Sequence, residues 1–164
     1  MSRHWIFVVA DHHVGKSKIY AEDVLRVRTK CRLWFFRRGT PNLRHLREGD
    51  EVIFYVGGKR GGWFGGRCTI KRGPTMLGPK EKRLSQWTTG KPYDMLVELA
   101  PAELWVRLKP SKDLLHSLSF IKNKRNWKAH FQVGIVSIPP EDHKKIVEFV
   151  LLAPTIKPNY EVAR

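Results

Sequence analysis

The sequence is poor in acidic residues and in cysteine. Of its 164 residues, 15 are aspartate or glutamate and 31 are lysine or arginine, which gives a formal net charge of +16. The two cysteines, Cys31 and Cys68, stand far apart with no histidine at metal-ligand spacing, so the pattern predicts neither a zinc site nor a disulfide framework. We therefore expect a basic protein that uses no metal and no other cofactor.

Long apolar runs and catalytic signatures are also missing. No stretch approaches the roughly 20 apolar residues of a membrane-spanning helix, and the first residues lack the apolar core of a signal peptide. No G-x-S-x-G or H-E-x-x-H motif occurs, and no cysteine stands beside a plausible histidine base. These absences predict a soluble cytoplasmic protein that binds no membrane and is not an enzyme.

The remaining composition suits one compact domain, because 41% of the residues are hydrophobic and 11% are aromatic. Strands that alternate with turns and a few short helices predict an α+β fold with a curled or closed β-barrel flanked by short helices. We expect the domain to span residues 1–153 and a C-terminal tail to span 154–164. The expected strands are 5–10, 31–36, 52–56, 63–72, 93–99 and 104–108, and the expected helices are 21–30, 111–118 and 140–152.

Three connecting segments carry polar or glycine-rich sequence. Residues 11–18 read as a loop after the first strand, and residues 73–92 read as a long polar loop that holds Trp87. Residues 57–62 are a glycine-rich hairpin turn rather than a phosphate-binding P-loop, because no Ser or Thr follows the lysine and no helix follows the turn.

Basic residues gather in two clusters, at 26–47 and 122–128, without acidic partners nearby in the sequence. The second cluster is interleaved with Phe120, Trp127 and Phe131. Lysine and arginine contact phosphates and release condensed counterions, while flat rings stack on unstacked bases. This combination indicates a nucleic-acid-binding surface.

The order of residues in the second cluster is specific. Residues 120–131 read F-I-K-N-K-R-N-W-K-A-H-F and are followed by P-P-E-D at 139–142. This segment resembles the C-terminal signature of the EVE domain family, within the PUA-like superfamily that also contains the YTH readers of methylated adenine. The resemblance runs from Trp5 to about Leu152 and implies a PUA-like barrel with a pocket for one extruded, modified base.

The resemblance also implies roles for individual residues. The base-binding residues expected are Trp34 and Trp87 as opposing aromatic walls, with Tyr93 as a second choice for the wall, and Asp11, His12 and His13 at the base edge. The residues expected along the nucleic-acid backbone are Arg37, Arg38, Lys122, Asn123, Lys124 and Arg125. An acidic Asp11 would accept a hydrogen bond from an exocyclic amine, which suits adenine N6 or a cytosine-like edge.

The expected function is therefore a monomeric reader that binds RNA or DNA carrying a modified base, and any effector must be a separate protein. Two alternatives stay open. A small hydrolase of the ASCH type would need a Lys, a Thr and a Glu to converge, for which Lys16, Thr29 and Glu22 are candidates. A general PUA-type RNA-binding module would ignore the modification.

Overall fold

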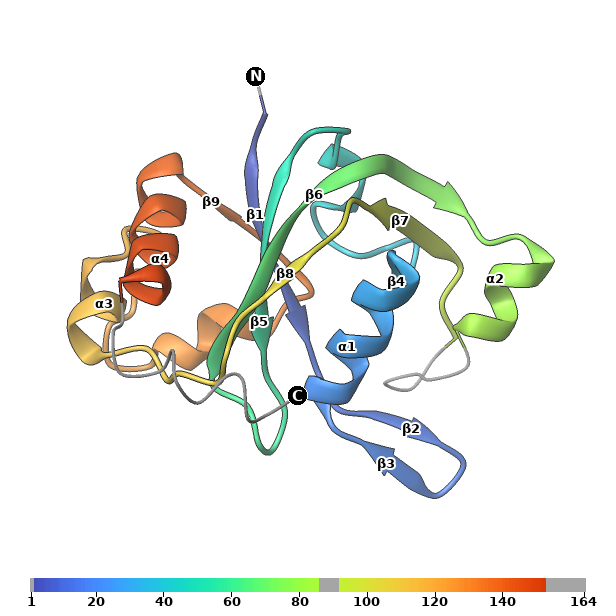
Figure 1. Ribbon diagram of the computed structural model, residues 1–164, viewed down its shortest axis with the longest axis horizontal. Helices are drawn as coiled ribbons and strands as arrows, with labels where there is room; N and C mark the ends of the chain where they lie inside the picture. The colour runs from blue at the N-terminus through green and yellow to red at the C-terminus, as the bar shows by residue number, and fades with distance from the viewer. Residues whose placement is uncertain (1, 86–91, 153–164) are drawn as a thin grey trace.

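The computed structural model describes residues 2–85 and 92–152. Strands in chain order are β1 (His4–Val9), β2 (His12–Val14), β3 (Ser17–Ile19), β4 (Leu33–Phe36), β5 (Glu51–Val56), β6 (Trp63–Met76), β7 (Met95–Leu99), β8 (Glu103–Leu104) and β9 (Ile135–Ile138) (Figure 1). Helices are α1 (Ala21–Cys31), α2 (Pro79–Leu84), α3 (Lys112–Ser117) and α4 (Pro140–Leu151), with 3-10 turns η1 (Leu43–His45) and η2 (Trp127–Phe131). None of the helices in these ranges is long and apolar enough to span a membrane.

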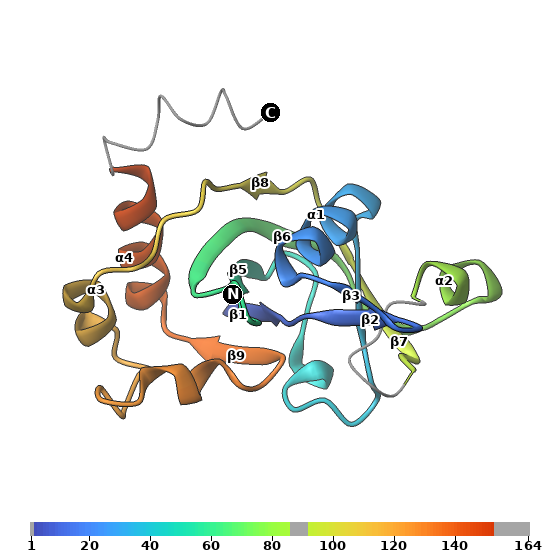
Figure 2. The ribbon, with the colours of Figure 1, turned by 90° about the horizontal axis from the view of Figure 1, so that it is seen from below.

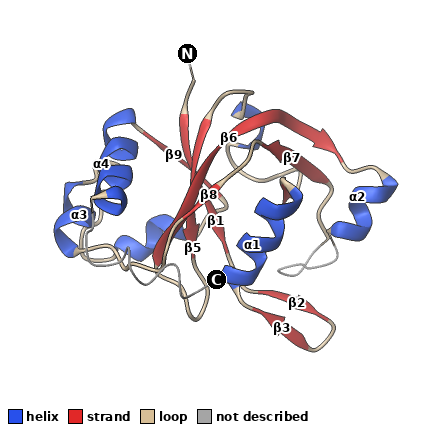
Figure 3. Cartoon of the chain, viewed as in Figure 1, coloured by secondary structure: helices blue, strands red, loops and turns tan. Residues whose placement is uncertain are grey.

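The main sheet has the order β4-β7-β6-β5-β1-β9, and β8 pairs with β6 outside this path. β1 and β5 are parallel, whereas the other neighbours are antiparallel (Figure 3). β6 pairs first with β5 and then with β7, and its register shifts at Ile70 and Arg72. Bulges of this kind bend a strand and increase its twist, which explains why β6 curls across the molecule (Figure 2).

The core follows the period-two alternation of the strands. Trp5, Phe7 and Val9 of β1 face the cluster under α1, whereas Ile6 faces a second cluster. Phe54 and Tyr55 of β5 divide between the two clusters in the same way. Helices α3 and α4 lie together on one side of the sheet and α1 lies on the other (Figure 1).

The predicted α+β class and the curled sheet are confirmed. A closed barrel is not present in the described part of the chain, because the edge strands β4 and β9 are not paired with each other. Residues 11–18 were predicted as a loop, but residues 12–19 form the small β2–β3 hairpin. The long loop predicted at 73–92 is shorter, because β6 continues to Met76 and α2 follows it. The tail predicted at 154–164 lies outside the described residues.

Candidate functional site

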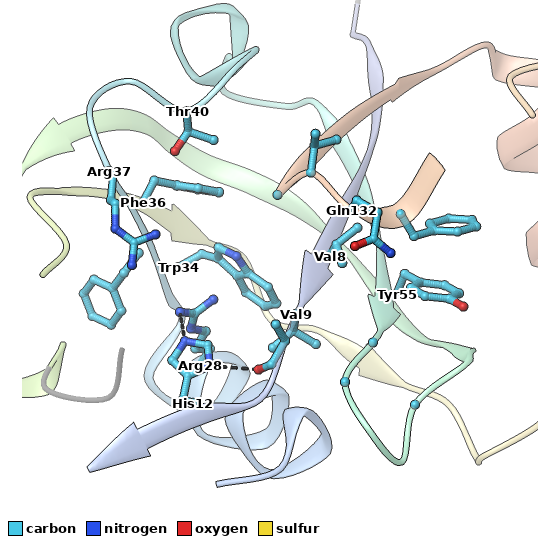
Figure 4. Close-up of a pocket in the computed structure, with 18 of the residues that line it drawn as sticks. Val8, Val9, His12, Arg28, Trp34, Phe36, Arg37, Thr40, Tyr55 and Gln132 are labelled. Carbon is cyan, nitrogen blue, oxygen red and sulfur yellow. Dashed lines mark hydrogen bonds between the residues drawn. The ribbon is translucent and has the colours of Figure 1, made fainter. Parts of the chain in front are cut away.

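A pocket of about 420 Å³ lies where the carboxyl end of β1 meets β4 and the turn between β5 and β6 (Figure 4). Four glycines of that turn form part of its wall, and the chain from Lys128 to Gly134 contributes another wall. The turn packs closely, since a side chain at Gly61 would meet the Gly57 carbonyl group. The pocket therefore collects several of the segments that the sequence singles out.

Trp34 borders the pocket but is 1% exposed. The Phe54 ring stacks on it with centroids 5.0 Å apart, and the guanidinium of Arg28 lies 4.7 Å from its ring centroid. With so little of the residue exposed, the indole offers a base little surface for direct stacking in this structure. In the described structure Trp34 has the surroundings of a core residue, and both Trp34 and Arg28 line the pocket.

Three side chains form a hydrogen-bonded network in the pocket. His12 Nδ1 donates to the Ala10 carbonyl oxygen at 2.8 Å, because a carbonyl only accepts. The other ring nitrogen, Nε2, then accepts from the Tyr93 hydroxyl at 2.8 Å and from Arg28 Nη2 at 3.0 Å. His12 is thus held as a neutral imidazole of one tautomer.

Charge and burial explain why His12 stays neutral. The side chain is almost fully buried, and burial together with the positive charge of Arg28 lowers its pKa to about 4. Two influences oppose this shift, the hydrogen bond to Ala10 and the negative charge of Asp11. At neutral pH the imidazole is therefore an acceptor for the two neighbours that donate to it.

Arg28 is a buried cation, with 6% of the residue exposed. Burial lowers the pKa of its guanidinium and Tyr93 opposes that effect. The guanidinium nevertheless remains charged at neutral pH, as arginine does in proteins. Within residues 2–85 and 92–152, no carboxylate forms an ion pair with it. Since no fully buried side-chain nitrogen in those ranges lacks a partner, each guanidinium nitrogen either has a partner, such as His12 or Tyr93, or is reached by solvent.

Asp11 lies beside the pocket but does not line it. Its carboxylate accepts from the backbone N–H groups of Ala21 and Lys59 at 2.9 and 3.0 Å, and Lys18 lies 3.6 Å away. Burial acts to raise the pKa of this carboxyl, but the two backbone donors and Lys18 together hold it below its usual value. Asp11 thus caps α1 and fastens the glycine turn, so both oxygens are already engaged.

The other residues predicted near the base divide between pocket and surface. Tyr93 lines the pocket through its ring and hydroxyl, and Arg37 also lines it, with its guanidinium 4.9 Å from the Tyr93 ring. His13 is exposed on the β2–β3 hairpin. Arg38 is exposed too, and its backbone N–H donates to Asp94 at 2.7 Å. Trp87 lies outside the described residues.

The end of the signature segment lines the pocket through Lys128 and Phe131, whereas the four residues expected along the backbone, at 122–125, do not line it. Lys122 and Arg125 are exposed, while Lys124 Nζ donates to the Leu118 carbonyl at 2.7 Å and Asn123 Oδ1 accepts from the Asn126 N–H at 3.1 Å. Lys128 is the basic residue of the signature segment that lines the pocket. The segment begins at a fixed point, because buried Asp142 accepts hydrogen bonds from the backbone N–H groups of Ser119 and Phe120.

The hydrolase candidates are not brought together. Lys16 is exposed in the β2–β3 turn, Glu22 pairs with Arg26 and Arg107, and Thr29 donates to the Leu25 carbonyl. None of the three lines the pocket.

The sequence reading missed Arg28. The signal was available, since Val24, Leu25 and Arg28 follow the spacing of one helical face and the two apolar members predict that this face is buried. A single charged residue on the buried face of an amphipathic helix is a more specific indication of a binding site than a cluster of surface charges. The sequence signature contains Asp142 but does not reveal that its carboxylate anchors the backbone at Ser119 and Phe120.

Comparison with known proteins places this geometry in context. No family model matches the chain. A UPF0310 protein of Pyrococcus abyssi is 28% identical over 130 residues, which cover 70% of this chain and 82% of that protein.

Two solved human structures are similar in fold. THYN1, in complex with DNA containing 5-methylcytosine, has a TM-score of 0.59 at 15% identity, over 90% of this chain and 97% of that one. The DUF55 domain of thymocyte nuclear protein 1 has a TM-score of 0.60 at 14% identity, over 91% and 99%. The resemblance to the EVE domain family is therefore confirmed: the chain has the fold of these DUF55 proteins and is similar in sequence to a UPF0310 protein.

Proposed function

We propose that the protein is a reader of DNA or RNA that holds one extruded, modified base in the pocket and binds it without chemical turnover. The observation that carries this proposal is the buried guanidinium of Arg28, which faces the pocket with no carboxylate to neutralise it in the described ranges. A buried charge without a counter-ion costs several kcal/mol, on the order of the penalty for desolvating one ion. A ligand rich in hydrogen-bond acceptors would offset that cost.

The size and lining of the pocket suit a base. A volume of about 420 Å³ falls within the roughly 300–1,000 Å³ typical of small-molecule sites. The base would lie against the guanidinium of Arg28, which itself rests on Trp34, and near the Tyr93 ring. Arginine planes and aromatic rings are the surfaces on which proteins stack unstacked bases.

The donors in the pocket predict which base edge is favoured. The guanidinium offers a fork of N–H groups, which matches two adjacent acceptors such as N3 and O2 of cytosine or O6 and N7 of guanine. An exocyclic amine of the base would meet the N–H groups of Arg28 as a second hydrogen-bond donor, and no hydrogen bond would form. Because both Asp11 oxygens are occupied by backbone N–H groups, the amine-reading role expected for Asp11 finds no support, and we propose an acceptor-rich base instead.

Basic side chains around the pocket support binding of the flanking strand. Lys128 lies at the pocket, and Lys122 and Arg125 are exposed on the same segment. A protein with a net charge of +16 also attracts polyanions over long range. The structural neighbour THYN1, crystallised with DNA containing 5-methylcytosine, adds support for a methylated, cytosine-type ligand.

Fluorescence anisotropy on a set of matched single-stranded oligonucleotides tests the proposal. The central position carries cytosine, 5-methylcytosine, adenine, N6-methyladenine or an abasic sugar. We expect the abasic oligonucleotide to bind about tenfold more weakly than the cytosine one, because stacking contributes about 1–3 kcal/mol. A methyl group that fills a dry part of the pocket should add about fivefold. Equal affinity for the abasic and the base-containing strands would refute capture of a base.

A further inference from the structure

Two histidines and a glutamate meet at the end of the sheet far from the pocket. His4 begins β1 and Glu51 begins β5, and these two residues are register partners in the parallel pair. The pocket lies at the other end of the same strands, at Val9 and Gly57. The third member, His143, comes from the first turns of α4.

The three side chains face one another at short range. His4 Nε2 lies 2.9 Å from Glu51 Oε2, and the His4 and His143 rings have centroids 4.6 Å apart. Taking one ligand atom from each residue, all three atoms lie within 4.8 Å of one another. The cluster therefore offers two imidazole nitrogens and one carboxylate oxygen around a common point.

His143 provides a second, independent observation. The residue is 9% exposed, yet its imidazole forms no hydrogen bond with any residue in 2–85 or 92–152. No fully buried side-chain nitrogen in these ranges lacks a partner, so the ring nitrogens of His143 reach solvent and are open to an ion that approaches His4 and Glu51. A metal ion is a partner that all three side chains accept at once.

We infer that His4, Glu51 and His143 bind a divalent transition-metal ion, with zinc as the best fit. Zinc prefers imidazole and carboxylate ligands in a tetrahedral arrangement, whereas calcium and magnesium prefer oxygen ligands alone. Three protein ligands leave a fourth position for water. This proposal is independent of nucleic-acid binding, because the ligands take no part in the pocket.

The three ligand atoms need to move only a short way to coordinate one ion. At zinc–ligand distances of about 2.0–2.2 Å, tetrahedral ligand atoms lie about 3.3 Å apart, so the widest gap must shrink by about 1.5 Å. Glu51 can supply this movement, since 42% of its side chain is exposed. The positive charge of Arg67 acts on His143, but Arg67 pairs with Glu103 at 3.2 Å.

Bound metal would connect α4 directly to the starts of β1 and β5. The sequence does not reveal such a site, because its three ligands come from three separate elements and show none of the close spacing of a zinc motif. The prediction that the protein uses no metal rested on that spacing.

Titration of zinc chloride into the full-length, tag-free and EDTA-treated protein tests the inference. By calorimetry we expect one ion per chain with micromolar or tighter affinity, and saturation should raise the melting temperature by about 4–10 °C. Glu51→Gln and His143→Gln should each weaken binding at least about tenfold. Both variants remain informative if their metal-free melting temperatures match that of the parent protein.

His116→Gln is the matched control, because His116 is exposed on α3 and its loss should leave zinc affinity unchanged. Cobalt titration supplies a second readout, since its visible spectrum distinguishes nitrogen and oxygen ligands from a thiolate such as exposed Cys31. Absence of saturable zinc binding overturns the inference. So does a thiolate charge-transfer band, an equal calcium-induced shift in melting temperature, or parental affinity in both ligand variants.

Discussion

The guanidinium of Arg28 lies 4.7 Å from the centre of the Trp34 ring, in the lining of the pocket where we propose that a base binds. The cation and the indole thus line the pocket together. A base held here would stack on a charged plane backed by an aromatic ring, which joins stacking and hydrogen bonding in one side chain. Arg28 is therefore the residue on which the proposed selectivity depends most.

Arg28→Met should separate stability from binding. Removing a buried charge that has no carboxylate partner in residues 2–85 and 92–152 should raise the melting temperature by about 2–4 °C, equivalent to about 1 kcal/mol. Affinity for a cytosine-containing oligonucleotide should fall about 10- to 100-fold toward that for the abasic strand. Arg26→Met, on an exposed position of the same helix, removes the same charge and should keep base selectivity. Identical behaviour of the two variants would argue against a role for Arg28 in the pocket.

Trp34→Ala should destabilise the fold. The ring is 1% exposed and stacks on Phe54, so its loss leaves a cavity that costs about 3–5 kcal/mol in the free energy of unfolding. Urea denaturation measures this change. Trp105→Ala removes a half-buried indole and should cost less. A Trp34→Ala protein with parental stability would show that the indole is not part of the core.

Asp11→Ala should weaken the fold rather than change base preference. The substitution leaves the backbone N–H groups of Ala21 and Lys59 without their acceptor, at a cost of about 1–3 kcal/mol. The neighbouring His13→Ala, at an exposed site, should change stability by less than about 0.5 kcal/mol. If Asp11→Ala instead altered the ranking of bases at unchanged stability, the carboxylate would belong to the binding site.

Lowering the pH should reduce the free energy of unfolding, because His12 is held neutral in the folded protein. Its pKa is about 4 in the folded chain and about 6.5 in the unfolded chain, so between these values the unfolded chain binds the extra proton. This contribution to stability is complete above pH 6.5 and is lost as the pH falls toward 4, by about 3 kcal/mol in total. Urea denaturation at pH 7, 5.5 and 4.5 should show that His12→Gln loses less stability than the parent over this range. Parallel curves for the two proteins would contradict the assignment.

Backbone contacts should appear as salt dependence. Lys122→Ala and Arg125→Ala should weaken binding of methylated and unmethylated strands equally, because phosphates carry no base information. Each should also reduce the slope of log affinity against log salt concentration by about 0.7 on single strands. Lys144→Ala, whose Nζ pairs with Glu148 at 3.8 Å, is the control with an unchanged slope. An unchanged slope in Lys122→Ala and Arg125→Ala would place the strand elsewhere.

Regular elements were predictable where one local rule governed them. The apolar run at 52–56 is the buried strand β5, and Ser111 caps α3 as expected, with its hydroxyl oxygen accepting from the Leu114 N–H at 3.1 Å. The β2–β3 hairpin was missed because its three-residue strands are mostly exposed and show no apolar alternation. α2 was not predicted because none of its residues is buried, so its sequence shows no apolar face.

The site was harder to predict because its residues acquire their roles through tertiary contacts. His12 and Tyr93 were singled out, and they meet although they lie 81 positions apart in the chain. The resemblance implied Trp34 as a wall of the pocket, and Trp34 does line it, but the ring stacks on Phe54 and is almost fully buried. No sequence pattern shows that a carboxylate such as Asp11 is already occupied by backbone N–H groups from two other segments.

The bulged strand β6 links the local unfolding of the two ends of the main sheet. Its first half pairs with β5 and its second half with β7, so one continuous strand belongs to both ends of the sheet. Neither end can separate without breaking hydrogen bonds of that shared strand. Amide protons on β5 and β7 should therefore exchange with solvent in a single concerted opening, and ligand captured in the pocket should slow exchange across the whole sheet.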